Sequence, residues 1–350
     1  MAAKRLGRVH LNGSVNLHDA KAVFDTAGRI LGPRLKRVPD GEPGPRRLWI
    51  SNQYLIFRAN YFLEPMPPSV ATPTSRAGTP LMRLRAGFAA KDVVFPALGY
   101  AREARASYPD FVAARRAGRL PRRARFQVSL PTPIACEYNY LADEARAAVG
   151  PIYEKAMLRE IAEMCASIPQ RDLAIQWDVA VEMVIFDGRA RESPWDDLAG
   201  ELRARFARYA KAVPRGVELG FHLCYGDFDR HHTVEPMDTR KMVEMANLIA
   251  ESVRRPIHWI HMPVPIERSD GAYFAPLKGL KLAKDTELYL GLIHARDGLD
   301  GAKRRIAAAA NYVRGFGVAT ECGMGRSFAP GDVPKVLRLH AQAADYVATL

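Results

Sequence analysis

The 350-residue sequence contains no long apolar run, and this absence bounds where the protein can work. A membrane-spanning helix takes roughly 18 to 20 consecutive apolar residues, and no segment approaches that length. The first residues, MAAKRLGRVHLNGS, also lack the apolar core of a signal peptide. We therefore expect a cytoplasmic protein with no membrane partner.

Cysteine is scarce, and its four positions lie far apart in the chain: Cys136, Cys165, Cys224 and Cys322. Small secreted domains that depend on disulfides are much richer in cysteine and much shorter. This spacing excludes a disulfide framework as the basis of the fold. We expect these residues to be free thiols or metal ligands.

Two nucleotide-binding signatures are also missing. The first strand signal is followed by LNGSVNLHD, which has no G-x-G-x-x-G dinucleotide fingerprint. The formal charge is +13, and eight arginines lie between Arg102 and Arg125. No helix-turn-helix, zinc-finger or RNA-binding aromatic motif accompanies them, so we expect a solvated basic face and no nucleic-acid partner.

What the chain does contain is a regular alternation of strand and helix signals. Short runs rich in β-branched residues are separated by segments with apolar residues at helical spacing. Eight parallel strands alternating with helices are typical of a (β/α)₈ TIM barrel, an α/β fold that this length accommodates as one domain. The predicted strands lie within residues 8–16, 36–42, 126–133, 173–183, 217–227, 256–265, 287–298 and 315–325.

The domain prediction is a single barrel over residues 1–350 with one insertion. Residues 43–125 are too many for one crossover between the second and third strands. We expect them to form a helical insertion that caps the barrel mouth, where the carboxyl ends of the strands place the active site.

An H-x-C element, residues 222 to 224, lies in the fifth predicted strand. Alternate residues of a strand point to one side, so His222 and Cys224 can face a common point. Zinc accepts nitrogen and sulfur ligands, and Cys322 ends the eighth predicted strand. Taken alone, a histidine and a cysteine in a strand are more often core residues. With Cys322, His261 and His294 at the ends of other strands, a zinc site is favoured.

These motifs resemble the uroporphyrinogen decarboxylase and methionine synthase superfamily of barrels, and within it the C-terminal half of cobalamin-independent methionine synthase. The family's H-x-C element is matched by HLCY at His222 and Cys224, and its later D/N-C-G element by ECGMGR at Cys322. The resemblance spans nearly the whole chain. It implies a zinc ion that activates a thiol substrate.

Further roles follow from the resemblance alone. The family's I-G-S element is similar to Asn12-Gly13-Ser14, which implies that Ser14 lies near a substrate carboxylate. The H-G-E element is similar to Asp40-Gly41-Glu42, and the Q-x-D element is similar to Gln176-Trp177-Asp178. Both carboxylates are implied to hold a substrate amino group, and His294 in GLIHARDG is similar to a proposed proton carrier.

The chain departs from the family at two places. The fourth zinc ligand is a glutamate in the family, whereas IHWIHMPVPIERSD offers His261 or Glu267 according to the alignment. The tryptophan on which the family stacks folate is missing, and Tyr138 or Tyr140 is its nearest substitute. The family's N-terminal half has no counterpart here either, so we do not expect a folate methyl donor.

These observations predict an enzyme with zinc as its cofactor and a small thiol or anionic molecule as its substrate. The leading hypothesis is zinc-dependent alkyl transfer, of a methyl group to sulfur. The first alternative is a zinc-dependent lyase or hydrolase that breaks a C–O or C–S bond of a small anionic or aromatic substrate. The second is a non-catalytic barrel that binds zinc or thiols. Whether the chain forms a homo-oligomer stays open.

Overall fold

The computed structural model describes residues 6–48, 50–67, 80–190, 192–226 and 231–350. In these residues seven parallel strands pair in the order β1-β4-β5-β6-β7-β8-β9 and curl into a TIM-like barrel. The predicted α/β barrel class is confirmed. The strands are β1 Arg37–Pro39, β4 Arg125–Pro131, β5 Leu173–Val179, β6 Glu218–Leu223, β7 Trp259–Pro263, β8 Glu287–Ile293 and β9 Gly317–Thr320.

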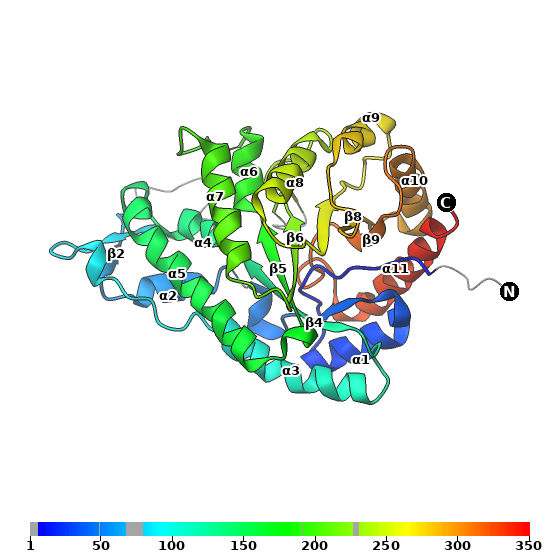
Figure 1. The fold of residues 1–350 in the computed structure, drawn as a ribbon, viewed down its shortest axis with the longest axis horizontal. Coiled ribbons are helices and arrows are strands. Elements are labelled where there is room, and N and C mark those ends of the chain that lie inside the picture. Colours follow the sequence, from blue (N-terminus) through cyan, green and yellow to red (C-terminus); the bar gives the residue numbers. More distant parts are fainter. Residues whose placement is uncertain (1–5, 49, 68–79, 191, 227–230) are drawn as a thin grey trace.

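Helices connect successive strands and surround the sheet (Figure 1). Parallel neighbours require such crossovers, because a tight turn cannot join them. The helix that precedes β1 is capped at its N-terminus by Asp19, whose side chain accepts from the Ala22 N–H at 2.7 Å. The barrel helices are α1 Ala20–Leu31, α4 Pro133–Tyr140, α5 Asp143–Ser167, α6 Val181–Asp187, α7 Leu198–Lys211, α8 Arg240–Ser252, α9 Gly271–Phe274, α10 Gly298–Ala310 and α11 Val333–Val347.

The long connection between β1 and β4 contains two kinds of structure. Helix α2 Gln53–Ala59 packs on α4, and β2 Leu63–Pro65 pairs antiparallel with β3 Met82–Leu84 beside α5. Helix α3 Tyr100–Arg116 packs against α1 and α5 and so joins the outer helical layer. That residues 43–125 cap the barrel mouth stays a prediction.

The first predicted strand, residues 8–16, forms isolated bridges rather than a ladder. Val9 bridges to Leu35 on one side and to Val318 on the other, so this segment links the two edges of the sheet. At Leu11 and Asn12 the backbone carbonyls accept from interior side chains: Gln127 donates to the Leu11 carbonyl and Gln176 to the Asn12 carbonyl, each at 2.9 Å. These bonds replace the ladder hydrogen bonds that a regular strand would make.

The barrel interior is unusually polar for a fold whose core is commonly filled with branched apolar residues. Gln176 is fully buried, and its Oε1 lies 2.8 Å from His10 Nε2 and accepts from Trp259 Nε1 at 3.1 Å. The Trp259 ring occupies the space beside Gly220, where a Cβ atom would lie only 2.0 Å from the ring. A polar column therefore fills the centre of the barrel.

Charged side chains close the amino-terminal end of the barrel. Arg37 is buried, donates to Glu287 at 2.8 Å and lies 4.3 Å above the Trp259 ring centroid. Glu218 also pairs with Arg37. Buried charges are tolerated only when paired in this way.

Among the described residues, no helix combines the length and apolar character that a membrane span requires.

Candidate metal centre

Three side chains with metal-binding atoms converge beyond the carboxyl ends of β6 and β9. His222 lies in β6, Cys224 follows that strand, and Cys322 follows β9. Their possible ligand atoms all lie within 4.8 Å of one another, and the two sulfurs are 3.8 Å apart. In the described part of the chain, no other group of three or more His, Cys, Asp or Glu side chains meets this spacing.

The β5–β6 pairing orients the first two of these side chains. Asp178 lies opposite His222 in the register of β5 and β6. The Cys224 N–H donates to the Val179 carbonyl at 3.0 Å, which continues the pairing one step past the end of β6. The chain is therefore still extended at Cys224, and its side chain points to the same side as His222.

The loop after β9 is held against Ser14. The Ser14 carbonyl accepts from the Met324 N–H at 2.6 Å, and its hydroxyl accepts from the Gly325 N–H at 3.2 Å. A Cβ atom at Gly323 would lie 2.3 Å from the Ser14 hydroxyl, so only glycine allows this approach. Ser14, a predicted substrate-binding residue, thus supports the loop that carries Cys322.

The cysteine pair fits zinc better than any covalent alternative. Two sulfurs, each about 2.3 Å from a tetrahedral zinc ion, are about 3.8 Å apart. That is the separation of Cys224 and Cys322, which are free cysteines. The hydrogen bond with Cys224 and burial raise the pKa of the Cys322 thiol well above its usual range. Two thiolates at this site therefore need a cation beside them. One imidazole nitrogen and two sulfurs are a ligand set that would bind zinc.

The two predicted fourth ligands lie in different surroundings. His261 is fully buried in β7, and its Nδ1 is 2.7 Å from His222 Nδ1. Burial, then the neighbouring His222, lowers the pKa of His261 well below its usual value. Glu267 is exposed and forms an ion pair with Arg296. The structure brings His261 to the cluster and leaves Glu267 at the surface.

Two carboxylates lie beside the cluster. Burial raises the pKa of Asp178 to about 6, although His222 and the Gln176 amide, which donates to Asp178 at 2.8 Å, oppose the change. Burial, followed by the charge of Asp178, raises the pKa of Glu42 well above its usual range. Carboxylates that repel each other in this way favour a cationic partner, such as an ammonium group.

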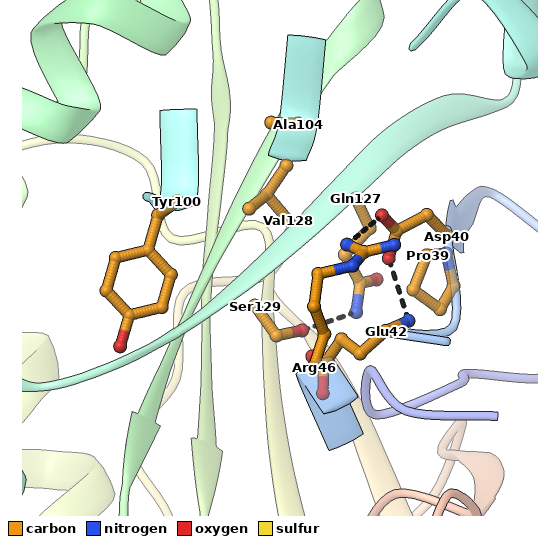
Figure 2. A pocket seen from close by; sticks show the side chains of 9 residues that line it. All are labelled: Pro39, Asp40, Glu42, Arg46, Tyr100, Ala104, Gln127, Val128 and Ser129. Atoms are coloured by element: carbon orange, nitrogen blue, oxygen red, sulfur yellow. Dashed lines mark hydrogen bonds and ion pairs between the residues drawn. The ribbon is translucent and has the colours of Figure 1, made fainter. Parts of the chain in front are cut away.

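A small cavity adjoins Glu42, which is the one non-glycine residue with a positive φ, 51°, among the described residues. Figure 2 shows the Arg46 guanidinium against Asp40, and the hydroxyl of Ser129 near Glu42. Ser107 also donates to Asp40, at 2.7 Å. The charge of Asp40 is therefore engaged by its own neighbours.

Sequence reasoning missed several residues that line this cavity. They come from helix α3, from β4, and from β1 and the turn after it, and no motif links these segments in the sequence. Only the folded chain shows that the start of α3 reaches the site. The lining residues that had no predicted role are Pro39, Asp40, Arg46, Tyr100, Ala104, Gln127, Val128 and Ser129.

The predicted proton carrier, His294, follows β8 and is mostly buried. Its Nε2 lies 2.9 Å from the Val264 carbonyl, which only accepts hydrogen bonds, so this nitrogen carries the proton. Its Nδ1 is 3.5 Å from a carboxylate oxygen of Glu321, the residue before Cys322. Burial, with help from Arg305, lowers the pKa of His294 to about 4. A neutral His294 thus presents a basic nitrogen beside the cysteine loop.

The predicted stacking residues Tyr138 and Tyr140 are both buried in helix α4. The guanidinium of Arg146 lies 3.9 Å from the centroid of the Tyr138 ring. The Tyr140 hydroxyl donates to the Ile50 carbonyl at 2.8 Å, and its ring contacts Phe57. Neither ring presents an open face to a flat ligand.

Solved structures share this architecture across nearly the whole chain. A candidate vitamin-B12-independent methionine synthase from Listeria monocytogenes is 12% identical with a TM-score of 0.58, over 96% of this chain and 98% of that one. A B12-independent methionine synthase from Shewanella sp. W3-18-1, solved in complex with selenomethionine, is 14% identical with a TM-score of 0.57, over 97% and 96%. A methyltransferase from Methanosarcina mazei is 12% identical with a TM-score of 0.53, over 97% and 93%.

The sequence itself matches no protein-family model and no curated protein. The predicted resemblance to the methionine synthase barrels is confirmed at the level of the fold. At these identities the likeness extends to the architecture and no further.

Proposed function

We propose that this protein is a zinc-dependent enzyme that transfers an alkyl group, most simply methyl, to the sulfur of a small thiol. The observation that carries the proposal is the group formed by His222, Cys224 and Cys322, with its two sulfurs 3.8 Å apart. The methionine synthases and the methyltransferase that share the fold support this choice of chemistry.

The cluster would hold zinc through one imidazole nitrogen and two thiolates. Zinc bound there would lower the pKa of a coordinated thiol and so supply a thiolate nucleophile at neutral pH. The ligand charges add to −2, which the ion neutralises in a site where two uncompensated thiolates would be costly. Three protein ligands leave a coordination position for substrate, as catalytic zinc sites require.

The surrounding side chains would orient the substrate and manage its proton. Glu42 and Asp178 would together suit a substrate ammonium group, since burial and the charge of Asp178 disfavour the ionisation of Glu42 and a nearby cation would offset both effects. His294 is neutral at pH 7 and offers its Nδ1 as a base, with Glu321 placed to stabilise the protonated ring. It would carry the proton to or from the alkyl donor.

Zinc content of the purified protein tests the metal site. Protein prepared without added zinc should contain one zinc per chain, and Cys224→Ser and Cys322→Ser should each contain much less. Cys165→Ser is the matched control, because Cys165 lies in α5 away from the cluster, and it should keep its zinc. Full zinc content in both cluster variants would overturn the site.

A lyase or hydrolase is the second candidate, and one observation favours it. Tyr138 and Tyr140 offer no open aromatic face for a folate donor, whereas the small cavity at Glu42 suits a compact substrate. The two functions separate in one assay with the zinc-loaded protein. Product formation that requires an added thiol supports the transferase, and turnover without any thiol supports the lyase or hydrolase.

A further inference from the structure

His222 and His261 form a close pair of buried imidazoles. They lie opposite each other in the register of β6 and β7, and their Nδ1 atoms are 2.7 Å apart. At that distance one nitrogen must donate a proton and the other must accept it, since two lone pairs or two N–H groups would repel. The question is which of the two rings donates.

The hydrogen bond at the other ring nitrogen of His261 shows which ring donates. Its Nε2 lies 3.0 Å from the Thr320 carbonyl oxygen, which can only accept, so Nε2 carries a proton. Asn12 Nδ2 donates to the same oxygen at 2.8 Å, which accounts for the 3.3 Å separation between these two donors. A second proton would make a fully buried cation of His261, so its Nδ1 is the acceptor.

Metal binding by His222 fits the same arrangement. A histidine that binds a metal through Nε2 must carry its one proton on Nδ1. His222 would then donate from Nδ1 to His261, and His261 would donate from Nε2 to Thr320. The Thr320 hydrogen bond therefore leaves the Nε2 atom of His222 with a lone pair for a metal ion.

We propose that His261 is a positioning residue that fixes the tautomer and ring orientation of His222, so that Nε2 of His222 is the metal-binding atom. This inference rests on the proposed function in taking the cluster as a metal site. Metal-binding histidines usually donate to a carboxylate, a backbone carbonyl or water. A neutral imidazole in that place adds no negative charge to a site that already holds two cysteines.

The proposal differs from the alternative in which His261 is itself the fourth ligand. Both of its nitrogens are engaged, one with His222 and the other with Thr320. Direct ligation would require His261 to give up one of these bonds. The two readings therefore predict different zinc environments and different effects of substitution.

Two variants of nearly equal shape make the test. His261→Asn keeps an oxygen that can accept from His222, whereas His261→Leu removes every polar atom. Competition with a chromophoric chelator gives the zinc affinity, and X-ray absorption of the zinc-loaded proteins gives the ligand shell. We expect His261→Leu to bind zinc about 10 to 100-fold more weakly than wild type and His261→Asn within about threefold of it. All three should show two sulfurs and one imidazole.

Two imidazoles in the wild-type shell would overturn the proposal, as would equal losses in both variants or none in His261→Leu. Circular dichroism of the metal-free variants checks that they fold. Nitrogen-15 NMR of histidine-labelled, metal-free wild type tests the tautomers without any variant. It should show Nδ1–H on His222 and Nε2–H on His261, and the reverse pattern would refute the inference. Failure of wild type to bind zinc would instead refute the proposed function.

Discussion

Asp178 should destabilise the folded, metal-free protein at neutral pH. Its pKa rises from an ordinary 3.8 to about 6 in the fold, so ionisation is easier in the unfolded chain. Each pKa unit corresponds to about 1.4 kcal/mol. The resulting decrease in the free energy of unfolding is absent below pH 3.8, grows as the pH rises, and is complete above pH 6. We expect it to be about 1.5 kcal/mol at pH 5 and about 3 kcal/mol at pH 7.5.

The substitution Asp178→Asn removes this penalty and keeps the shape of the side chain. Its amide oxygen can still accept the hydrogen bond from Gln176, which is 2.8 Å long in the wild type. Urea unfolding of the metal-free proteins at pH 5 and pH 7.5 should therefore find the variant more stable, with the larger gain at pH 7.5. Alkyl transfer should be lost in the same variant, because the substrate ammonium loses a counter-charge.

The control is Asp285→Asn, at an exposed position, where a change within about 0.5 kcal/mol is expected. An Asp178→Asn protein no more stable than wild type at pH 7.5 would contradict the reasoning. A gain that is equal at the two pH values would do so too, because the effect would then not come from ionisation.

Three other predictions address the donor, the interior and the base of the barrel. Isothermal titration with methyltetrahydrofolate, with or without a triglutamate tail, should show no micromolar binding, because neither Tyr138 nor Tyr140 offers an open face for the stacking worth about 0.5 to 1.5 kcal/mol. Tight binding with methyl transfer to homocysteine would contradict this. Gly220→Ala should lower the free energy of unfolding in urea by about 1 to 3 kcal/mol, since the new Cβ atom would lie 2.0 Å from the Trp259 ring. Unchanged stability would show that the ring moves freely. Burial opposes the charge of Glu287, but Arg37 and Lys36 lower its pKa to about 2. The substitution Glu287→Gln should therefore lower the free energy of unfolding by about 3 kcal/mol above pH 4.5, and by progressively less as the pH falls towards 2. A loss of stability that does not depend on pH would exclude the ion pairs as its cause.

The strand pattern of the sequence was enough to predict the barrel and the order of its strands, but the predicted strands 173–183, 217–227, 287–298 and 315–325 run four or five residues past the ends of β5, β6, β8 and β9. His222, Cys224 and Cys322 could be predicted to meet because strand ends share one rim of the barrel. The irregular first segment could not be predicted, because the Leu11 carbonyl is bound by Gln127 from a strand more than a hundred residues away. Local preference carries no information about such a bond.

The proposed role of His261 shows a second limit. Its position at a strand end correctly suggested closeness to the cluster, but a ligand and the neighbour of a ligand have the same place in the sequence. The distinction depends on the Thr320 carbonyl and on which nitrogen faces it, 3.0 Å away. Tyr100 was missed for a similar reason, since only the packing of α3 brings it to Glu42.

The seam at which the barrel closes has a consequence for biosynthesis. Asn12 donates to the Thr320 carbonyl, 308 residues further along the chain, and Val9 bridges to Val318. At a ribosomal rate of about 5 to 20 residues per second, the first segment waits roughly 15 to 60 s for its partners. Until then the first segment can bridge to Leu35 but not to β9, and Cys322 has not joined His222. A nascent chain should therefore complete the proposed metal site only when β9 and Cys322 leave the exit tunnel, and chaperone binding should be greatest just before that point.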